Sequence, residues 1–140
     1  RPEIQVIKLY GDLPTIACYP GQLNQVFMNI FANAIDALEE ADRGRSYQEI
    51  QAQPDRITIC TALSDDREKA IVRIADNGRG MTPEIAQKVF DRSFTTKAIG
   101  KGTGLGLAIS RKIVEETHGG QLICTSTPDR GTEFTIVLPL

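Results

Sequence analysis

Two glycine-rich stretches of this 140-residue chain hold residue types suited to binding a charged small molecule. One runs from Asp76 to Met81 and the other from Gly100 to Leu107. Neither has the spacing of a Walker A loop or of the dinucleotide fingerprint G-x-G-x-x-G. The second directly precedes a predicted helix, where free backbone amides and the helix dipole favour an anion. The sequence therefore predicts nucleotide phosphate binding by a third arrangement, with a flexible hinge as the alternative. The residues expected at the phosphates are Gly102, Thr103, Gly104, Leu105, Gly106 and Leu107.

Two asparagines on an upstream segment add candidate metal ligands. Residues 22–41 carry apolar side chains at three- and four-residue spacing, which predicts an amphipathic helix. Asn29 and Asn33 lie one turn apart on its polar side, in a stripe without lysine or arginine. Carboxamide oxygens suit Mg²⁺, which takes few protein ligands together with phosphate oxygens and water. We therefore expect a Mg²⁺ site on this helix, the alternative being an ordinary solvated surface.

Asp76 is the third candidate. It follows the apolar strand predicted for residues 71–75 and precedes Gly78 and Gly80, which let a ligand approach the backbone closely. A carboxylate at the floor of a pocket can accept a hydrogen bond from an exocyclic amine such as that of adenine. The alternative is an aspartate that simply opens a turn. Downstream, Lys97 and Lys101 could reach a terminal phosphate as point charges or remain solvated.

The elements that must position these residues alternate between hairpins and helices. Predicted strands cover residues 4–10, 15–18, 56–62, 69–75, 121–127 and 132–138, and predicted helices cover residues 22–41, 82–89 and 105–117. Residues 43–53 and 90–103 show no period and are predicted to be loops. Because hairpins argue against an all-parallel sheet, we expect an α+β, two-layer sandwich: a mixed sheet of about five strands with three helices on one face.

Composition restricts the partners. The formal charge is −2 with dispersed basic residues, which disfavours nucleic acid binding. Three well-separated cysteines lack metal or redox spacing, as in a reducing compartment, and no apolar run is long enough for a membrane span. We expect a cytoplasmic domain without direct membrane contact. Since predicted structure begins almost at residue 1, residues 1–140 are interpreted as one domain of a longer protein, preceded by a neighbouring domain.

Five motifs in order resemble the boxes of sensor histidine kinase catalytic domains, members of the GHKL superfamily. They are Asn29-Ile-Phe-Ala-Asn33, Asp76-Asn-Gly-Arg-Gly-Met81, Phe90-Asp-Arg-Ser-Phe94-Thr-Thr-Lys97, Gly102-Thr-Gly-Leu-Gly-Leu107 and Gly131-Thr-Glu-Phe134. The resemblance implies the Bergerat ATP-binding fold. It also implies that Asn33 coordinates Mg²⁺, that Asn29 lies near the phosphates and that Asp76 pairs with the adenine amine. Residues 90–103 would form an ATP lid whose Lys97 contacts the terminal phosphate. Further residues implied at the nucleotide are Gly78, Gly80, Met81, Phe90, Thr95, Thr96 and Thr132.

Position 29 separates a kinase from a hydrolase. ATPase relatives such as type II topoisomerases and MutL proteins are similar but carry a glutamate there as general base, whereas this chain has Asn29. A carboxamide cannot take that proton, so efficient hydrolysis is disfavoured. The only histidine, His118, stands at a predicted helix end before two glycines and is interpreted as a cap. The resemblance then implies γ-phosphoryl transfer to a histidine on a separate dimerisation domain, and a response regulator receiver domain as a further partner. The alternatives are a nucleotide-gated interaction module and a GHKL ATPase or serine kinase.

Overall fold

The computed structural model describes residues 3–91 and 106–140. Its strands are β1 (Gln5–Tyr10), β2 (Arg56–Leu63), β3 (Lys69–Asp76), β4 (Gln121–Thr127) and β5 (Gly131–Pro139). Its helices are α1 (Pro20–Asp42), α2 (Tyr47–Ala52), α3 (Pro83–Ala86) and α4 (Gly106–Lys112), and α4 continues as the π-helical segment η1 (Ile113–Thr117). The predicted α+β class is confirmed.

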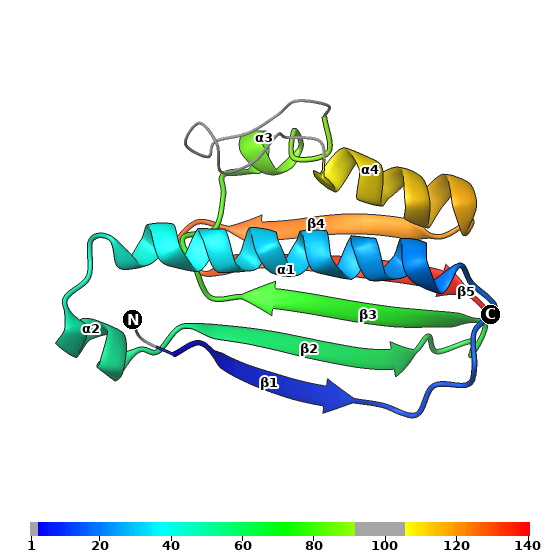
Figure 1. Ribbon diagram of the computed structural model, residues 1–140, viewed down its shortest axis with the longest axis horizontal. Coiled ribbons are helices and arrows are strands. Elements are labelled where there is room, and N and C mark those ends of the chain that lie inside the picture. Colours follow the sequence, from blue (N-terminus) through cyan, green and yellow to red (C-terminus); the bar gives the residue numbers. More distant parts are fainter. Residues whose placement is uncertain (1–2, 92–105) are drawn as a thin grey trace.

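The five strands form one mixed sheet in the order β1-β2-β3-β5-β4 (Figure 1). β1 pairs parallel with β2, and the other pairs are antiparallel. Two of these antiparallel pairs are the predicted hairpins. In the β3–β5 ladder Asp76 lies opposite Thr132, and in the β4–β5 ladder Ser126 lies opposite the same Thr132. The register therefore gathers three polar residues at one end of three adjacent strands.

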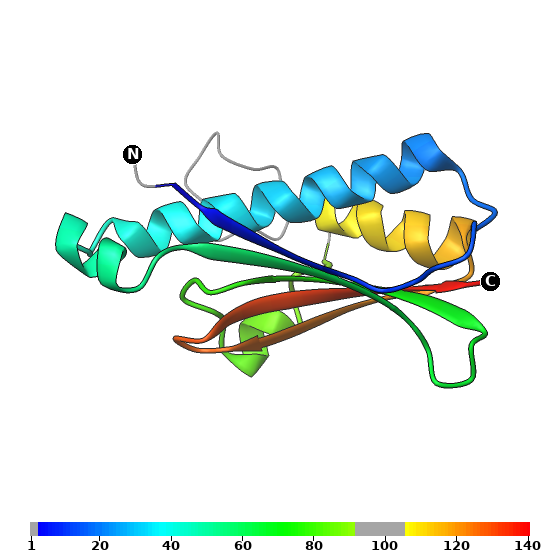
Figure 2. The same ribbon diagram turned by 90° about the horizontal axis from the view of Figure 1, so that it is seen from below.

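α1 and α4 cover one face of the sheet (Figure 2), which fits the predicted two layers. α3 lies next to the edge strand β4 (Figure 1). The apolar stripe of α1 faces the sheet because its spacing follows the helical period. Its buried residues are Leu23, Val26, Ile30, Ala34 and Leu38, and they pack in one cluster with Ile57, Ile74, Leu122, Phe134, Ile136 and Leu138 of the strands.

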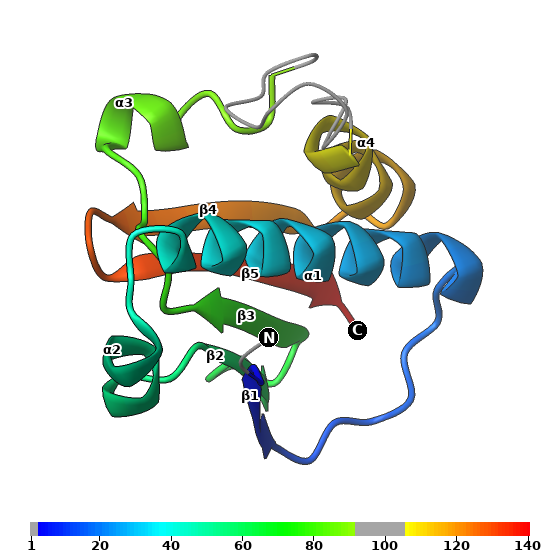
Figure 3. The ribbon, with the colours of Figure 1, turned by 60° about the vertical axis from the view of Figure 1, so that its left-hand side comes forward.

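One predicted loop contains a helix. Residues 43–53 include α2, which lies below the C-terminal end of α1 and next to the start of β2 (Figure 3). Ser46 and Glu49 form a reciprocal capping box, since each side chain accepts a hydrogen bond from the other's backbone amide. The S-x-x-E spacing was the available signal, and a single buried residue, Ile50, was too little to produce a period.

Three further boundaries differ from expectation. Residues 15–18, predicted as a short strand, have no strand structure. α3 ends at Ala86, before the predicted end near residue 89. The predicted helix 105–117 is α-helical to Lys112 and π-helical from Ile113, while its predicted first residue lies outside the described residues. None of the helices described is long and apolar enough to cross a membrane.

Arg45 fixes the connection between α1 and β2. Its guanidinium lies 3.3 Å from the carboxylate of Asp55, which is 3% exposed, and 3.2 Å from that of Asp42. The same side chain donates to the carbonyl oxygens of Glu49 and Gln53. Because one side chain links the end of α1, the α2 segment and the residue before β2, residues 43–53, which are predicted to be a loop, have a defined shape.

Candidate nucleotide-binding site

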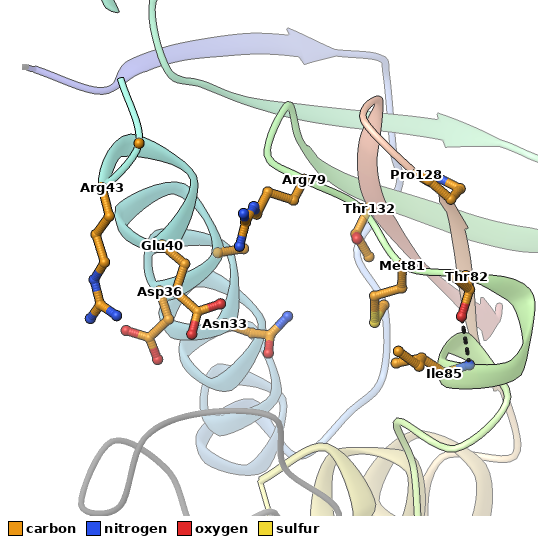
Figure 4. Close-up of a pocket in the computed structure, with 13 residues that line it drawn as sticks. Asn33, Asp36, Glu40, Arg43, Arg79, Met81, Thr82, Ile85, Pro128 and Thr132 are labelled. Carbon is orange, nitrogen blue, oxygen red and sulfur yellow. Dashed lines mark hydrogen bonds between the residues drawn. The ribbon is translucent and has the colours of Figure 1, made fainter. Parts of the chain in front are cut away.

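A pocket of about 770 Å³ lies between the C-terminal half of α1, the β3–α3 segment and the β4–β5 turn (Figure 4). Its volume is within the range of small-molecule sites. The residues that line it are Asn33, Asp36, Ala37, Glu40, Arg43, Gly44, Arg79, Gly80, Met81, Thr82, Ile85, Pro128 and Thr132. Four of the residues predicted at a nucleotide, Asn33, Gly80, Met81 and Thr132, are thus brought together.

Asp76 ends β3 beside this pocket and is 7% exposed. Its Oδ1 accepts a hydrogen bond from the Gly78 amide at 2.9 Å. Burial raises the pKa of the Asp76 carboxyl above its ordinary value, while the amides of Gly78 and Thr132 partly oppose that shift. The carboxylate therefore has little water around it, and a ligand that donates a hydrogen bond would replace the missing solvation.

The Asp76 charge also affects the thiol of Cys124. Burial, followed by the Asp76 charge, raises the pKa of Cys124 to about 11. Cys124 is free and partly buried, as are Cys18 and Cys60. The Cys124 thiol is therefore protonated at neutral pH and packs as a small apolar side chain.

Gly80 and Gly131, which stand in two different motifs, are required by backbone packing. Gly80 has φ of 69°, and a Cβ atom there would overlap the carbonyl oxygen of Thr127. At Gly131, with φ of 102°, a Cβ would overlap the carbonyl oxygen of Asp76. Gly78 is buried, with its Cβ position in contact with Ala37 and the Asp76 carboxylate. The two loops at the end of the sheet are therefore pressed together at positions where only glycine fits.

The two helix asparagines differ in what they bind. Asn29 is not among the pocket residues: its Nδ2 donates to the Gly106 carbonyl oxygen at 3.1 Å and to the Ser110 hydroxyl at 3.0 Å. Both of its amide hydrogens thus hold the start of α4 against α1. Asn33 lines the pocket and has no hydrogen-bond partner within residues 3–91 and 106–140. Asn33 therefore presents its whole carboxamide to the pocket, whereas Asn29 has both amide hydrogens committed to α4.

The remaining predicted site residues fall into two groups. Phe90 is partly buried against Phe134, with ring centroids 6.1 Å apart, and the Arg111 guanidinium lies 4.6 Å from its ring centroid. Leu107 packs against the core and Gly106 begins α4 beside Asn29. Those outside the described residues are Thr95, Thr96, Lys97, Gly102, Thr103, Gly104 and Leu105.

Four charged residues that line the pocket are not among the site residues predicted from the sequence. Asp36 and Glu40 line it from α1 and Arg43 from the residue after α1, while Arg79 lines it from the β3–α3 segment (Figure 4). Asp36 and Glu40 follow Asn33 by three and seven residues, so helical periodicity places them on the same face of α1. No periodic signal pointed to Arg43 or Arg79. The pocket lining thus carries both acidic and basic side chains.

The arrangement fits a metal that arrives with its ligand. Among the described residues there is no group of three or more His, Cys, Asp or Glu side chains that could hold a metal ion. Mg²⁺ commonly takes only one or two protein ligands when phosphate oxygens and water complete its shell. The uncommitted carboxamide of Asn33 at the pocket fits that role.

Known proteins resemble this chain over nearly its whole length. The family described as histidine kinase-, DNA gyrase B-, and HSP90-like ATPase matches residues 18–140. Sporulation kinase E of Bacillus subtilis is 37% identical over 134 residues, which are 96% of this chain and 16% of that protein. The signal transduction histidine-protein kinase AtoS of Escherichia coli is 40% identical over 135 residues, 96% of this chain and 19% of that protein. The chain therefore spans less than a quarter of the length of either relative.

Solved structures agree. The catalytic domain of histidine kinase ThkA superimposes with a TM-score of 0.74 at 28% identity and covers 97% of this chain and 80% of that one. The mycobacterial sensor histidine kinase MprB gives a TM-score of 0.74 at 26% identity, covering 97% and 81%. The match in fold thus extends over β1 to β5.

Proposed function

Because this chain belongs to the family of histidine kinase-, DNA gyrase B-, and HSP90-like ATPases, we propose that it binds Mg²⁺-ATP and transfers the γ-phosphoryl group to a histidine elsewhere in its parent protein. Its relatives Sporulation kinase E and AtoS are kinases several times longer than the matched region. A phosphoacceptor domain is accordingly a partner of the same parent protein. A response regulator receiver domain is the next acceptor in two-component signalling.

The observation that supports this proposal best is the pocket between α1 and the β3–α3 segment. Asn33, Met81 and Thr132 line it, and the buried carboxylate of Asp76 adjoins Thr132 in the ladder. Asp76 accepts hydrogen bonds from the adenine amine, and Asn33 binds the metal that accompanies the phosphates. Mg²⁺ supplies neutralisation of the charge that develops on the transferred group. The chain's own residues act by holding the nucleotide in place.

Asn29 favours transfer over hydrolysis. Both of its amide hydrogens are used by Gly106 and Ser110 of α4, and the side chain has no basic atom. General-base catalysis by a side chain contributes roughly 10²- to 10⁴-fold in rate, and position 29 supplies none. Water at the terminal phosphate is therefore not activated by the side chain at position 29, which favours transfer to an external nucleophile.

His118 is not the nucleophile. Its Nε2 accepts a hydrogen bond from the Tyr19 amide at 3.0 Å, so Nδ1 carries the proton and donates to the Ile113 carbonyl oxygen at 2.8 Å. Both ring nitrogens are thus engaged between the end of η1 and the start of α1. Since this is the chain's only histidine, the acceptor histidine belongs to another domain.

The test is a reconstituted transfer. The chain is incubated with Mg²⁺ and γ-labelled ATP, alone and with a separate histidine-bearing domain of a related kinase. We expect acid-labile, base-stable label on the added domain, little label on the chain and slow phosphate release. Asn33→Ala should abolish transfer, and Asn24→Ala, the same change at an exposed position of α1, should retain it. ATP binding without any transfer would contradict the kinase assignment.

A further inference from the structure

Ser126 of β4 makes three hydrogen bonds behind the pocket wall. Its Oγ accepts from the Met81 amide at 2.8 Å and donates to the Gly131 carbonyl oxygen at 3.0 Å. The same oxygen lies 2.9 Å from Oγ1 of Thr132. Ser126 is not itself among the residues that line the pocket, whereas Met81 and Thr132 are. Its contacts therefore reach the site through these two neighbours.

The number of protons available fixes the direction of the Ser126–Thr132 bond. A serine hydroxyl has one hydrogen and two lone pairs. Its hydrogen is used by Gly131, and one lone pair is used by Met81. The contact with Thr132 is satisfied only if Thr132 donates its hydrogen to Ser126. The hydrogen and both lone pairs of the Ser126 hydroxyl are then used, and the Thr132 hydroxyl hydrogen is held in one orientation.

The consequence for a ligand is a pocket floor that accepts hydrogen bonds. With its hydrogen turned toward Ser126, Thr132 offers a ligand only lone pairs. Asp76, opposite Thr132 in the β3–β5 ladder, is a carboxylate and also an acceptor. A group that donates, directly or through water, is favoured beside these two side chains. A carbonyl oxygen there would face lone pairs and leave a polar atom unpaired.

We propose that Ser126 is a positioning residue that fixes the Thr132 hydroxyl as an acceptor and thereby makes the pocket prefer a 6-amino purine over a 6-oxo purine. The inference rests on the proposed function, since it assumes that the base lies beside Asp76 and Thr132. It assigns to Ser126 a role in choosing the nucleotide, although its side chain does not touch it. Without Ser126, Thr132 is free to turn and donate to a 6-oxo group.

The experiment compares two nucleotides that differ at this position. Mg²⁺-ATP and Mg²⁺-inosine triphosphate are titrated calorimetrically into the wild-type chain, Ser126→Ala, Ser126→Thr, Thr132→Val and the double variant Ser126→Ala/Thr132→Val. Thr125→Ala changes an exposed neighbour on β4 and serves as the matched control. The melting temperature of each variant is recorded without nucleotide.

For Ser126→Ala we expect weaker ATP binding with no loss for inosine triphosphate. The ratio of the two affinities should fall about three- to tenfold, the value of one hydrogen bond. Ser126→Thr keeps the hydroxyl and should keep the ratio. Thr132→Val should lower the ratio by itself, and adding Ser126→Ala should change it no further.

Equal losses for both nucleotides in Ser126→Ala would overturn the inference, because a structural defect weakens both alike. An unchanged ratio in Thr132→Val would also overturn it, even if Ser126→Ala did not fold. If the wild-type chain binds ATP and only these ratios fail, the proposed function stands. If the wild-type chain binds no Mg²⁺-ATP, the proposed function itself fails and this inference fails with it.

Discussion

Replacing Asp76 with asparagine should change stability and affinity in opposite directions. Asparagine has nearly the same shape as aspartate and keeps an Oδ1 atom. This atom can accept the hydrogen bond that the Gly78 amide donates to Asp76 at 2.9 Å in the wild-type chain. What it removes is a negative charge on a side chain that is only 7% exposed. The substitution therefore removes the charge and weakens the interaction with the Thr132 amide, while the shape of the side chain is kept.

The expected stability change follows from the raised pKa of Asp76. The folded protein holds this proton more tightly than the unfolded chain, whose aspartates titrate near pH 3.9. The penalty of the charged form is absent below that pH, grows as pH rises through the folded pKa and is complete above it. At pH 7 the nucleotide-free Asp76→Asn chain should thus be more stable than wild type. A gain of about 1 kcal/mol would raise the melting temperature by about 4 °C.

The affinity of Asp76→Asn for ATP should fall. An adenine amine that meets an amide in place of a carboxylate loses a charge-assisted hydrogen bond, and a misplaced partner costs about 1–3 kcal/mol. That cost corresponds to roughly a 5- to 150-fold loss of ATP affinity. The variant is expected to be the more stable protein without nucleotide and the weaker binder.

Two measurements check this expectation. Urea denaturation of both chains at pH 7 and near pH 4 gives the stability difference, which should shrink at the lower pH. Calorimetric titration with Mg²⁺-ATP gives the affinity. A variant that was less stable at pH 7, or whose advantage grew on acidification, would show that burial of charge at Asp76 is not the governing effect. Unchanged ATP affinity would refute its role at the base.

Three other substitutions or reactions test separate features. Gly80→Ala, which has to overlap Thr127, should cost about 1–3 kcal/mol by denaturation, whereas Gly21→Ala in α1, with nothing within 4 Å of its Cβ position, should cost nothing. Arg45→Met should destabilise the protein by about 2–3 kcal/mol in the same assay, because it removes the guanidinium beside the buried carboxylate of Asp55. The cost is moderate because the Arg45 side chain is partly exposed. Alkylation of Cys124, followed by mass spectrometry at pH 8, should be slow, and Asp76→Asn should accelerate it by removing the charge that helps to suppress the thiolate. A rate independent of Asp76 would contradict that coupling.

The parts of the fold predictable from sequence are those with a local repeat. The three- and four-residue spacing of Leu23, Val26 and Ile30 defined α1, and alternation with turn residues defined both hairpins. The short helix α2 was missed because its capping box is a two-residue signal without a long apolar period. The strand predicted at residues 15–18 did not form.

Candidate site residues could be identified from the sequence where the side-chain type itself suggests a role, such as an amide oxygen for a metal or a carboxylate for an amine. Asn33 lines the pocket and Asp76 is buried beside it, and both were singled out by residue type and position. The partners of Asn29 were not predictable, because Gly106 is 77 residues away and no local pattern encodes that contact. Ser126 was also missed, although the register of the β4–β5 hairpin alone would have paired it with Thr132.

The first strand, finally, has a consequence for dynamics. All six residues of β1 are exposed, and within the described part of the chain β1 is an edge strand paired with β2, two strands away from Asp76. Its amide hydrogens should exchange with solvent through local detachment, at a free energy far below that of global unfolding. The β3 amides should exchange only when the whole domain opens. Whatever pulls on the beginning of this chain can therefore peel away its outermost strand while the cavity stays assembled.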